Sequence, residues 1–247
     1  VARWSPPLIG LQRRVRLGSA SRAAMGYINA MRLAGDLSHM LSFMVLLYKI
    51  HSAKSVAGIS LKTQELYILV FCARYVDIFW NFLSFYNSVM KVIFVLLSVL
   101  IVYVMRRGTP QRSTYNPEND TFPHQWLVLP CAILGVAINQ DYHSPFEMLW
   151  AFSIYLEAVA ILPQLHMVQK HGEVENLTAH YIFLLGMYRV LYLLNWIYRY
   201  MTEEGYWQPI VWVSGAVQTV LYLDFFYNYV KSKQKNLYQP VQISLPV

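Results

Sequence analysis

Hydrophobic residues are grouped into seven long segments that are separated by short polar stretches. A bilayer-spanning helix needs about 20 mostly apolar residues. Seven segments meet this length closely enough to predict transmembrane helices: 29–50, 61–83, 86–105, 124–140, 144–168, 178–201 and 206–230. The composition agrees, because 56% of the residues are hydrophobic and 13% are charged, against about 25% charged in soluble domains. We therefore expect an integral membrane protein built as a single all-α bundle.

The charges between the segments predict the orientation. The loops after segments two, four and six contain no Lys or Arg, whereas those after one, three, five and seven are basic. By the positive-inside rule the basic loops face the cytosol, so the N-terminus is luminal or extracellular and the C-terminus is cytosolic. The basic residues concerned are Lys49, Lys54, Lys62, Arg106, Arg107, Arg112, Lys170, Lys231, Lys233 and Lys235.

Residues 1–24 differ from the rest of the chain. They contain five arginines and no acid, so they account for five of the seven units of net positive charge. An acid-free, arginine-rich leader resembles a mitochondrial transit peptide, but it also breaks the charge rule, and Met25 is a plausible start. We expect residues 1–24 to be a non-native or disordered leader, 25–230 the transmembrane domain and 231–247 a cytosolic tail.

Cysteines and glycosylation motifs add little chemistry. Cys72 and Cys131 lie in apolar segments and are expected to be packing residues, with no disulfide framework, metal site or cofactor. The sequons that begin at Asn119 and Asn176 fall in predicted cytosolic loops. We expect both to remain unmodified, because glycosylation takes place on the luminal side.

Charged residues inside the apolar segments are the most informative feature of the sequence. An ionised side chain at the centre of a bilayer helix costs roughly 2.5–3.5 kcal/mol even on lenient scales. Nine of the charged residues inside the segments stand out: Arg32, Asp36, Arg74, Asp77, Glu147, Glu157, Arg189, Arg199 and Asp224. They predict a polar cavity inside the bundle with an excess of positive groups.

Helical spacing places many of these residues on common faces. Arg32, Asp36 and His39 have the spacing i, i+4, i+7, and Tyr188, Tyr192, Asn195 and Arg199 continue the same pattern over three turns. Each stripe also has a structural interpretation, since Arg32–Asp36 and Arg74–Asp77 could neutralise each other within a helix. Stripes on at least four helices favour the cavity.

The residue types indicate the ligand. Arginine grips a carboxylate with two parallel hydrogen bonds, and Trp150 one turn after Glu147 offers a place for a cation. This combination fits a short peptide that carries both signs of charge. His39 is the residue best able to titrate between pH 5 and 8, which predicts tighter anion binding at acidic pH. A histidine near Asp36 could instead remain protonated throughout.

Several segments together resemble the KDEL receptor family, and the resemblance covers residues 31–247. The segments are 31–39 (MRLAGDLSH), 57–60 (AGIS), 73–77 (ARYVD), 84–87 (SFYN), 152–164 (FSIYLEAVAILPQ), 180–200, 224–227 (DFFY) and 245–246 (LP). The resemblance implies a seven-helix fold like that of SWEET transporters and other PQ-loop proteins. Two parallel three-helix repeats are then joined by a linking helix, with Pro163 and Gln164 as the PQ pair.

The resemblance also implies a function. Such receptors cycle between the Golgi and the endoplasmic reticulum (ER) and bind the C-terminal Lys-Asp-Glu-Leu or His-Asp-Glu-Leu signal of luminal ER proteins. They bind in the acidic Golgi and release in the near-neutral ER. We therefore expect a multi-pass protein of the ER and cis-Golgi that returns cargo in coated vesicles.

Individual residues match the family's functional positions. The implied signal-binding residues are Arg32, Arg74, Tyr75, Asp77, Glu147, Trp150, Tyr192 and Arg199. The implied pH sensor is His39, and the implied lock, whose hydrogen bonds rearrange on binding, is Glu157, Tyr188 and Arg189. Asp224 matches an acid linked to transport. The tail lysines Lys231, Lys233 and Lys235 resemble a signal for the COPI coat, although the stretch after them is longer than usual; a basic flank that serves topology alone is the other interpretation.

Other functions fit less well. A transporter of the same fold is the main alternative, but a site rich in arginine suits neither neutral sugars nor cationic amino acids. The loops are short for a G-protein-coupled receptor. We expect no enzyme, because no nucleophile–base–acid arrangement is apparent, and no nucleic-acid partner.

Overall fold

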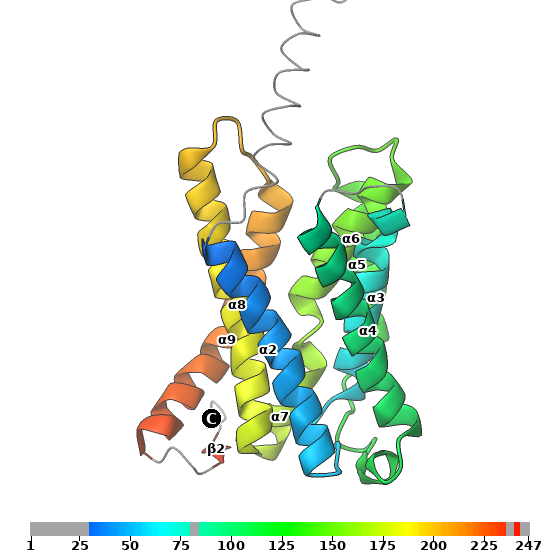
Figure 1. Cartoon of the computed structure of the whole chain (residues 1–247), viewed down its shortest axis with the longest axis vertical. Helices are drawn as coiled ribbons and strands as arrows, with labels where there is room; N and C mark the ends of the chain where they lie inside the picture. Colours follow the sequence, from blue (N-terminus) through cyan, green and yellow to red (C-terminus); the bar gives the residue numbers. More distant parts are fainter. Residues whose placement is uncertain (1–29, 80–83, 236–239, 243–247) are drawn as a thin grey trace, which may run out of the picture.

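A computed structural model describes residues 30–79, 84–235 and 240–242 of the chain. Within this part the molecule is a bundle of long helices with one very small sheet (Figure 1). The α-helices are α2 (Ala30–Ser52), α3 (Leu61–Arg74), α4 (Phe85–Arg107), α5 (Gln125–Ala137), α6 (Pro145–Val159), α7 (Leu162–His171), α8 (Asn176–Thr202) and α9 (Pro209–Lys235). Two 3₁₀ turns, η1 (Val76–Phe79) and η2 (Gln111–Thr114), follow α3 and α4.

Five stretches are long and apolar enough to cross a membrane: α2, α4, α6 with α7, α8 and α9. The predicted segments thus correspond to helices, but two are shorter than expected. Segment 61–83 is helical only to Arg74, after which η1 begins; residues 80–83 lie outside the described part. Segment 124–140 forms the 13-residue α5, a continuous helix that contains Pro130.

The predicted fifth segment is broken into α6 and α7. Pro163 is the cause, because proline has no N–H to donate to the carbonyl of residue 159 and its ring clashes with that carbonyl. The chain makes a turn at Ala160 and Ile161 and then continues as α7. α7 ends at Gly172, whose φ of 71° is the left-handed conformation that glycine adopts readily.

Serine residues cap the N-termini of three helices. Ser60, Ser84 and Ser144 each accept a hydrogen bond from the backbone N–H three residues on, at 3.1, 3.2 and 3.3 Å. A serine N-cap satisfies an amide that the helix itself leaves without a partner. These caps fix where α3, α4 and α6 start.

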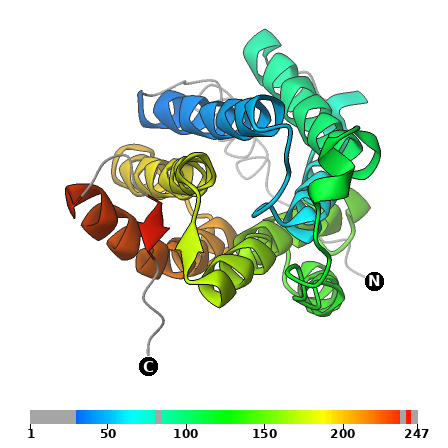
Figure 2. The same cartoon turned by 90° about the horizontal axis from the view of Figure 1, so that it is seen from below.

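The helices form two groups that face each other. The views from the side and from below show α2, α8 and α9 in one group and α3, α4, α5 and α6 in the other (Figures 1 and 2). α2 packs most extensively against α8, and α3 packs against α6. Small residues allow close approach, since a side chain at Gly35 would collide with Tyr192 and one at Gly135 with the backbone of Phe152.

The C-terminal part of the described chain folds back onto the bundle. β2 (Val241–Gln242) pairs antiparallel with β1 (Glu173–Val174), the connection between α7 and α8. Val174 and Val241 are opposite each other in this pair, and both are buried.

Candidate ligand-binding site

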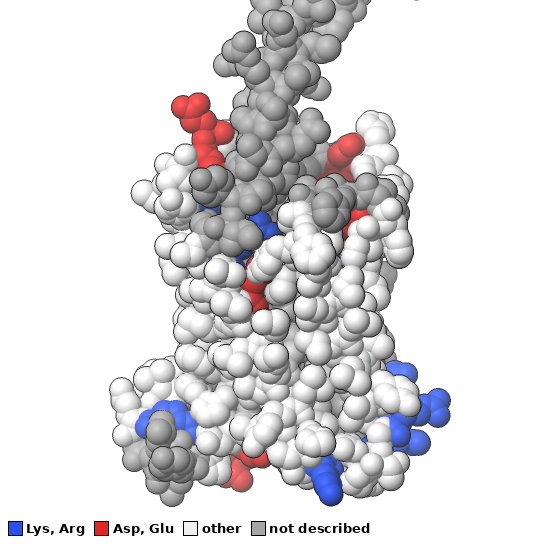
Figure 3. Space-filling view, viewed as in Figure 1, with Lys and Arg blue, Asp and Glu red and all other residues white. Residues whose placement is uncertain are grey.

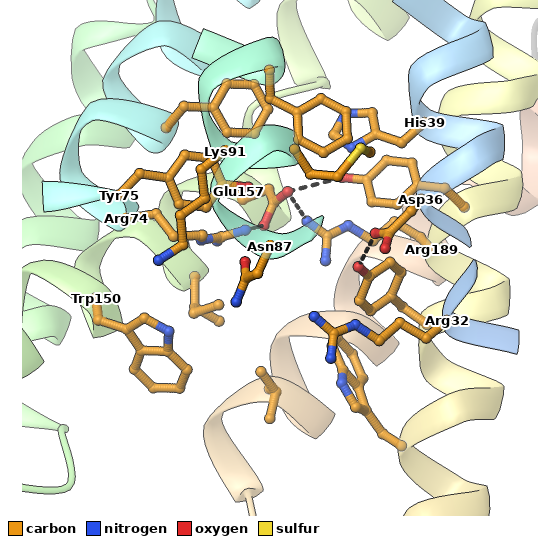
Figure 4. A pocket seen from close by; sticks show the side chains of 18 of the residues that line it. Arg32, Asp36, His39, Arg74, Tyr75, Asn87, Lys91, Trp150, Glu157 and Arg189 are labelled. Atoms are coloured by element: carbon orange, nitrogen blue, oxygen red, sulfur yellow. Dashed lines mark hydrogen bonds and ion pairs between the residues drawn. The ribbon is translucent and has the colours of Figure 1, made fainter. Parts of the chain in front are cut away.

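A polar cavity of about 300 Å³ lies between the two groups of helices. Its walls come from the starts of α2, α4 and α9, from the ends of α3 and α8, and from the first half of the Pro145–His171 span that α6 and α7 form. It therefore opens towards the end of the bundle opposite the basic loops. Figure 4 shows the side chains that point into it. The polar and charged lining residues are Arg32, Asp36, His39, Arg74, Tyr75, Tyr86, Asn87, Lys91, Trp150, Glu157, Tyr188, Arg189, Tyr192 and Trp196.

Glu157 is the acidic centre of the cavity wall. Its side chain is 2% exposed and forms ion pairs with Arg74 from α3 and Arg189 from α8. The Tyr188 hydroxyl donates a 2.9 Å hydrogen bond to Glu157 Oε1, and Arg74 Nε donates to Ser153 Oγ at 3.1 Å. One carboxylate therefore holds two buried guanidinium groups and joins three helices (Figure 4).

Asp36 forms a second polar centre. It accepts a hydrogen bond from the Tyr192 hydroxyl and another, at 2.8 Å, from the Tyr86 hydroxyl. The carboxylate is thus bound by tyrosines from α8 and α4. Arg32 lines the same cavity.

His39 is enclosed by aromatic rings. Its ring stacks on Tyr188 with the centroids 4.0 Å apart and on Phe94 at 4.6 Å. The side chain is buried, and within the described part of the chain Nε2 has no hydrogen-bond partner. The histidine therefore lies against Tyr188, whose hydroxyl is bonded to Glu157.

Asp77 is paired with a residue that the sequence analysis missed. Lys91 Nζ lies 2.7 and 2.8 Å from the two carboxylate oxygens of Asp77. Asp77 does not line the cavity, whereas Lys91 does. Arg74 and Asp77 thus each form an ion pair with a residue from another helix, Glu157 and Lys91 respectively. A lysine in the most apolar segment of the chain was the available signal.

Besides Asp77, three further predicted site residues lie outside the cavity lining. Arg199 makes a two-point ion pair with Glu203 four residues on, at 2.9 and 2.8 Å, and stacks on the Tyr206 ring at 4.2 Å. Burial raises the pKa of Tyr206, so its phenol is neutral beneath the guanidinium. Glu147 lies on α6 one turn before Trp150, away from the cavity surface, and Asp224 is exposed on α9.

The tail lysines have local contacts. Lys233 donates a hydrogen bond to the Asn176 side chain at the start of α8, and Lys231 lies 5.4 Å from the Tyr227 ring centroid. The Lys235 side chain and residues 243–247 are outside the described part. The sequon residue Asn176 is thus engaged by the tail.

The cavity carries an excess of positive charge. Its lining contains the four cations Arg32, Arg74, Lys91 and Arg189 but only two carboxylates. Two buried guanidinium nitrogens of the cavity, Arg74 Nη2 and Arg189 Nε, also have no hydrogen-bond partner among the described residues. Buried donors cost free energy when they are unpaired. The cavity is therefore suited to a ligand with anionic acceptor groups.

Tyr86, Asn87 and Ser153 were also missed by the sequence analysis. Tyr86 binds Asp36 and Ser153 binds Arg74, and Asn87 lines the cavity. Tyrosines are common at membrane interfaces, and a single serine or asparagine carries no helical pattern, so the sequence alone does not distinguish these three residues. The hydrogen bonds of Tyr86 and Ser153 and the position of Asn87 in the cavity lining do.

A bundle of membrane-length helices around a polar, arginine-rich cavity defines a multi-helix membrane protein with an internal candidate site. Comparison with known sequences identifies its family. The profile of the ER lumen protein retaining receptor family matches residues 55–199. The chain belongs to this family, which confirms the resemblance found in the sequence.

Similar proteins from distant organisms support the same family assignment. "ER lumen protein-retaining receptor A" of Arabidopsis thaliana is 54% identical over 209 residues, 85% of this chain and 97% of the relative. "ER lumen protein-retaining receptor 3" of Mus musculus is 52% identical over 218 residues, 87% of this chain and all of the relative. The "ER lumen protein-retaining receptor" of Entamoeba histolytica is 47% identical over 205 residues, 83% and 94% of the two chains.

Proposed function

We propose that this protein is a retention receptor that binds the C-terminal Lys-Asp-Glu-Leu or His-Asp-Glu-Leu signal of luminal ER proteins. It binds cargo in the acidic Golgi and returns it to the ER. Membership of a family whose relatives are named as such receptors supports the retention function. The observation that carries the choice of ligand is the cationic cavity with unpaired buried guanidinium donors.

The signal offers three carboxylates: two side chains and the chain terminus. In the proposal, Arg32 and Arg74 grip carboxylates within the cavity, and Tyr75 and Tyr192 add hydrogen bonds. Arg199 joins them by exchanging Glu203 for a ligand carboxylate. The exchange is inexpensive, because a partly exposed i,i+4 pair is worth only about 0.3–0.5 kcal/mol.

The basic first residue of the signal occupies the corner formed by Trp150, Glu147 and Asp77. Trp150 lines the cavity and provides an aromatic face for the cation. Glu147 lies one turn away on the same helix. Because Lys91 already binds Asp77, the incoming ammonium competes with an internal one at this corner.

Protonation of His39 is the proposed origin of pH dependence. His39 lines the same cavity as Arg74 and Arg189, and it stacks on Tyr188, which is bonded to Glu157. A proton on His39 adds positive charge to the cavity and so favours an anionic ligand at acidic pH. Rearrangement of the lock residues Glu157, Tyr188 and Arg189 then accompanies binding.

The fold proposed for this receptor has seven spans in two parallel three-helix repeats, with α5 as the linking helix. The helix contacts support it. If the first and second repeats exchange places, the α2–α8 contact becomes the contact of α6 with α3, α3–α4 becomes α8–α9, and α2–α4 becomes α6–α9; all six contacts are present. α3 and α5 are the two spans that fall below the usual length.

The remaining proposals concern transport. The N-terminus is luminal and the C-terminus cytosolic, in the ER and cis-Golgi. The lysines Lys231, Lys233 and Lys235 bind the COPI coat, and Asp224 contributes to transport. Lys233 is held by Asn176, so the tail must release this bond to present its lysines. Relatives named as receptors do not favour the alternative of a small-molecule transporter.

The test is binding of a labelled peptide that ends in Lys-Asp-Glu-Leu to the purified full-length protein. Binding is measured at about pH 5.5 and about pH 7.5, on either side of the usual histidine pKa. An amidated peptide is the control for the terminal carboxylate. We expect binding that is strong at acidic pH, weak at neutral pH and lost on amidation. Equal binding of the amidated peptide, or none at either pH by folded protein, would overturn the proposal.

A further inference from the structure

A second hollow, of about 360 Å³, lies at the basic end of the bundle, far from the cavity described above. It is formed where α4 ends and α3 begins. Three of its six lining residues are arginines and the other three are apolar or aromatic: Leu61, Met105, Arg106, Arg107, Arg112 and Tyr115. Figure 3 shows basic side chains gathered at this end, below a largely uncharged surface.

The chain after α4 folds so that a third arginine returns beside the first two. Gly108 N donates to Val104 O at 2.8 Å and closes the last turn of α4, and Arg112 N donates to Gly108 O at 2.9 Å. The Tyr115 hydroxyl then donates to the buried Asp120 carboxylate at 3.0 Å. Burial raises the pKa of Tyr115, so the phenol remains a hydrogen-bond donor. The loop that carries Arg112 is therefore anchored at both ends.

The hollow is positively charged. Arg106 donates two hydrogen bonds to Glu65, at 2.7 and 3.1 Å, and is held in position by them. Arg107 and Arg112 are exposed, and within the described ranges neither is paired with an acidic side chain. Two of the three guanidinium groups are thus available to a ligand.

The position of the hollow relative to the bilayer identifies the source of the ligand. α4 is the most apolar candidate span, and Leu96, Leu100 and Tyr103 on it are exposed, as expected of a lipid-facing surface. Arg106 and Arg107 follow this surface directly and so lie at the level of the headgroups. Leu61 and Met105 give the hollow an apolar wall that a soluble anion does not need.

We propose that this hollow binds the phosphorylated headgroup of an anionic lipid. Arg107 and Arg112 grip the phosphate oxygens, for which the planar guanidinium fork is well shaped. Glu65 holds Arg106 beside them, and the apolar wall contacts the glycerol region. Basic pockets at the cytosolic ends of transmembrane helices are the kind of site that recognises such headgroups.

The test uses the full-length protein in detergent and a fluorescent short-chain phosphatidylinositol monophosphate. We expect this probe to bind and to be displaced by its unlabelled form, but not by short-chain phosphatidylcholine or by inorganic phosphate. Arg107→Gln and Arg112→Gln should each weaken binding about five-fold. Displacement by inorganic phosphate at equal concentration would overturn the proposal of a lipid ligand.

Two controls distinguish specific binding in the hollow from non-specific attraction of the probe to positive charge. Lys170→Gln removes one exposed charge from the same end of the bundle and should leave probe binding unchanged. Arg107→Lys with Arg112→Lys keeps the charge but not the fork and should weaken binding several-fold. Equal weakening by Lys170→Gln, or full binding by the double lysine variant, would contradict the proposal. Binding of the Lys-Asp-Glu-Leu peptide, measured in parallel, reports separately on the retention function.

Discussion

Glu157 neutralises two buried guanidinium groups at once, those of Arg74 and Arg189. Glu157→Gln keeps the shape of the side chain but removes its charge. Breaking a buried ion pair by removing one partner costs about 3–5 kcal/mol, because the remaining charge is left uncompensated. We expect a loss of stability of this size, measured as the free energy of unfolding in detergent.

Glu203→Gln is the matched control for this prediction. It also removes a glutamate from an arginine pair, but Arg199 and Glu203 are partly exposed. Such a pair contributes at most about 1 kcal/mol. If both variants lost the same stability, the burial of Glu157 would not be the source of its importance.

The same Glu203 variant tests how Arg199 reaches a ligand. If Arg199 exchanges Glu203 for a ligand carboxylate, Glu203→Gln removes the competitor, and the signal peptide should bind about two-fold more tightly. Glu204→Gln removes an exposed charge from the next position and should have no such effect. Weaker binding by Glu203→Gln would indicate that Arg199 needs its partner for orientation.

Helical spacing predicted which residues share a face but not which residues pair. Arg32, Asp36 and His39 were expected on one face, and all three line the cavity. The partners of Arg74 and Asp77 were not predicted, because they come from α6 and α4. Spacing along one helix contains no information on the side chains of another, and Arg199 shows that a stripe can also continue beyond the cavity.

At the scale of elements, hydropathy predicted where helices occur but not where they break. Apolar residues of the 144–168 segment continue on both sides of Pro163, so only proline chemistry indicates the turn between α6 and α7. Segment 61–83 is likewise apolar to its end, yet α3 stops at Arg74. There the η1 turn directs Asp77 towards Lys91, a tertiary contact that a sliding window cannot detect.

Gln164, one residue after this proline, ties α7 to the start of α3. Its side chain accepts a hydrogen bond from Ser60 N at 2.8 Å and donates one to Gly58 O at 2.9 Å, and it is fully buried. Gln164→Leu leaves the buried Ser60 N–H unpaired, at a cost of about 1–3 kcal/mol, and also removes the bond to Gly58 O. We expect a clear decrease in thermal stability in detergent.

Gln169→Leu is the matched control, because Gln169 lies on the same helix and is exposed. The same change of side chain there should alter stability by no more than about 0.5 kcal/mol. A similar decrease for both variants would mean that leucine disturbs α7 itself and that the bonds to Ser60 and Gly58 contribute little.

At the scale of the whole molecule, the two ends of the bundle differ in charge, and this difference predicts orientation. The basic residues after α2, α4, α7 and α9 gather at one end, and the cavity opens towards the other (Figure 3). A receptor that captures luminal proteins needs this arrangement, with its cavity on the luminal side. The location of the cavity and the positive-inside rule therefore lead independently to the same topology.

Cysteine accessibility in sealed ER microsomes tests this topology. In a Cys72→Ala background, which removes the exposed native thiol, Lys170→Cys and Asp141→Cys each place one thiol at an exposed position at opposite ends of the bundle. The cytosolic face of such vesicles is outside. We expect a membrane-impermeant maleimide to label Lys170→Cys in intact vesicles and Asp141→Cys only after permeabilisation, with Asn119 and Asn176 unglycosylated in both. The reverse labelling would show that the protein has the opposite orientation, with its cavity on the cytosolic side. The physical basis for capture of luminal cargo would then be removed.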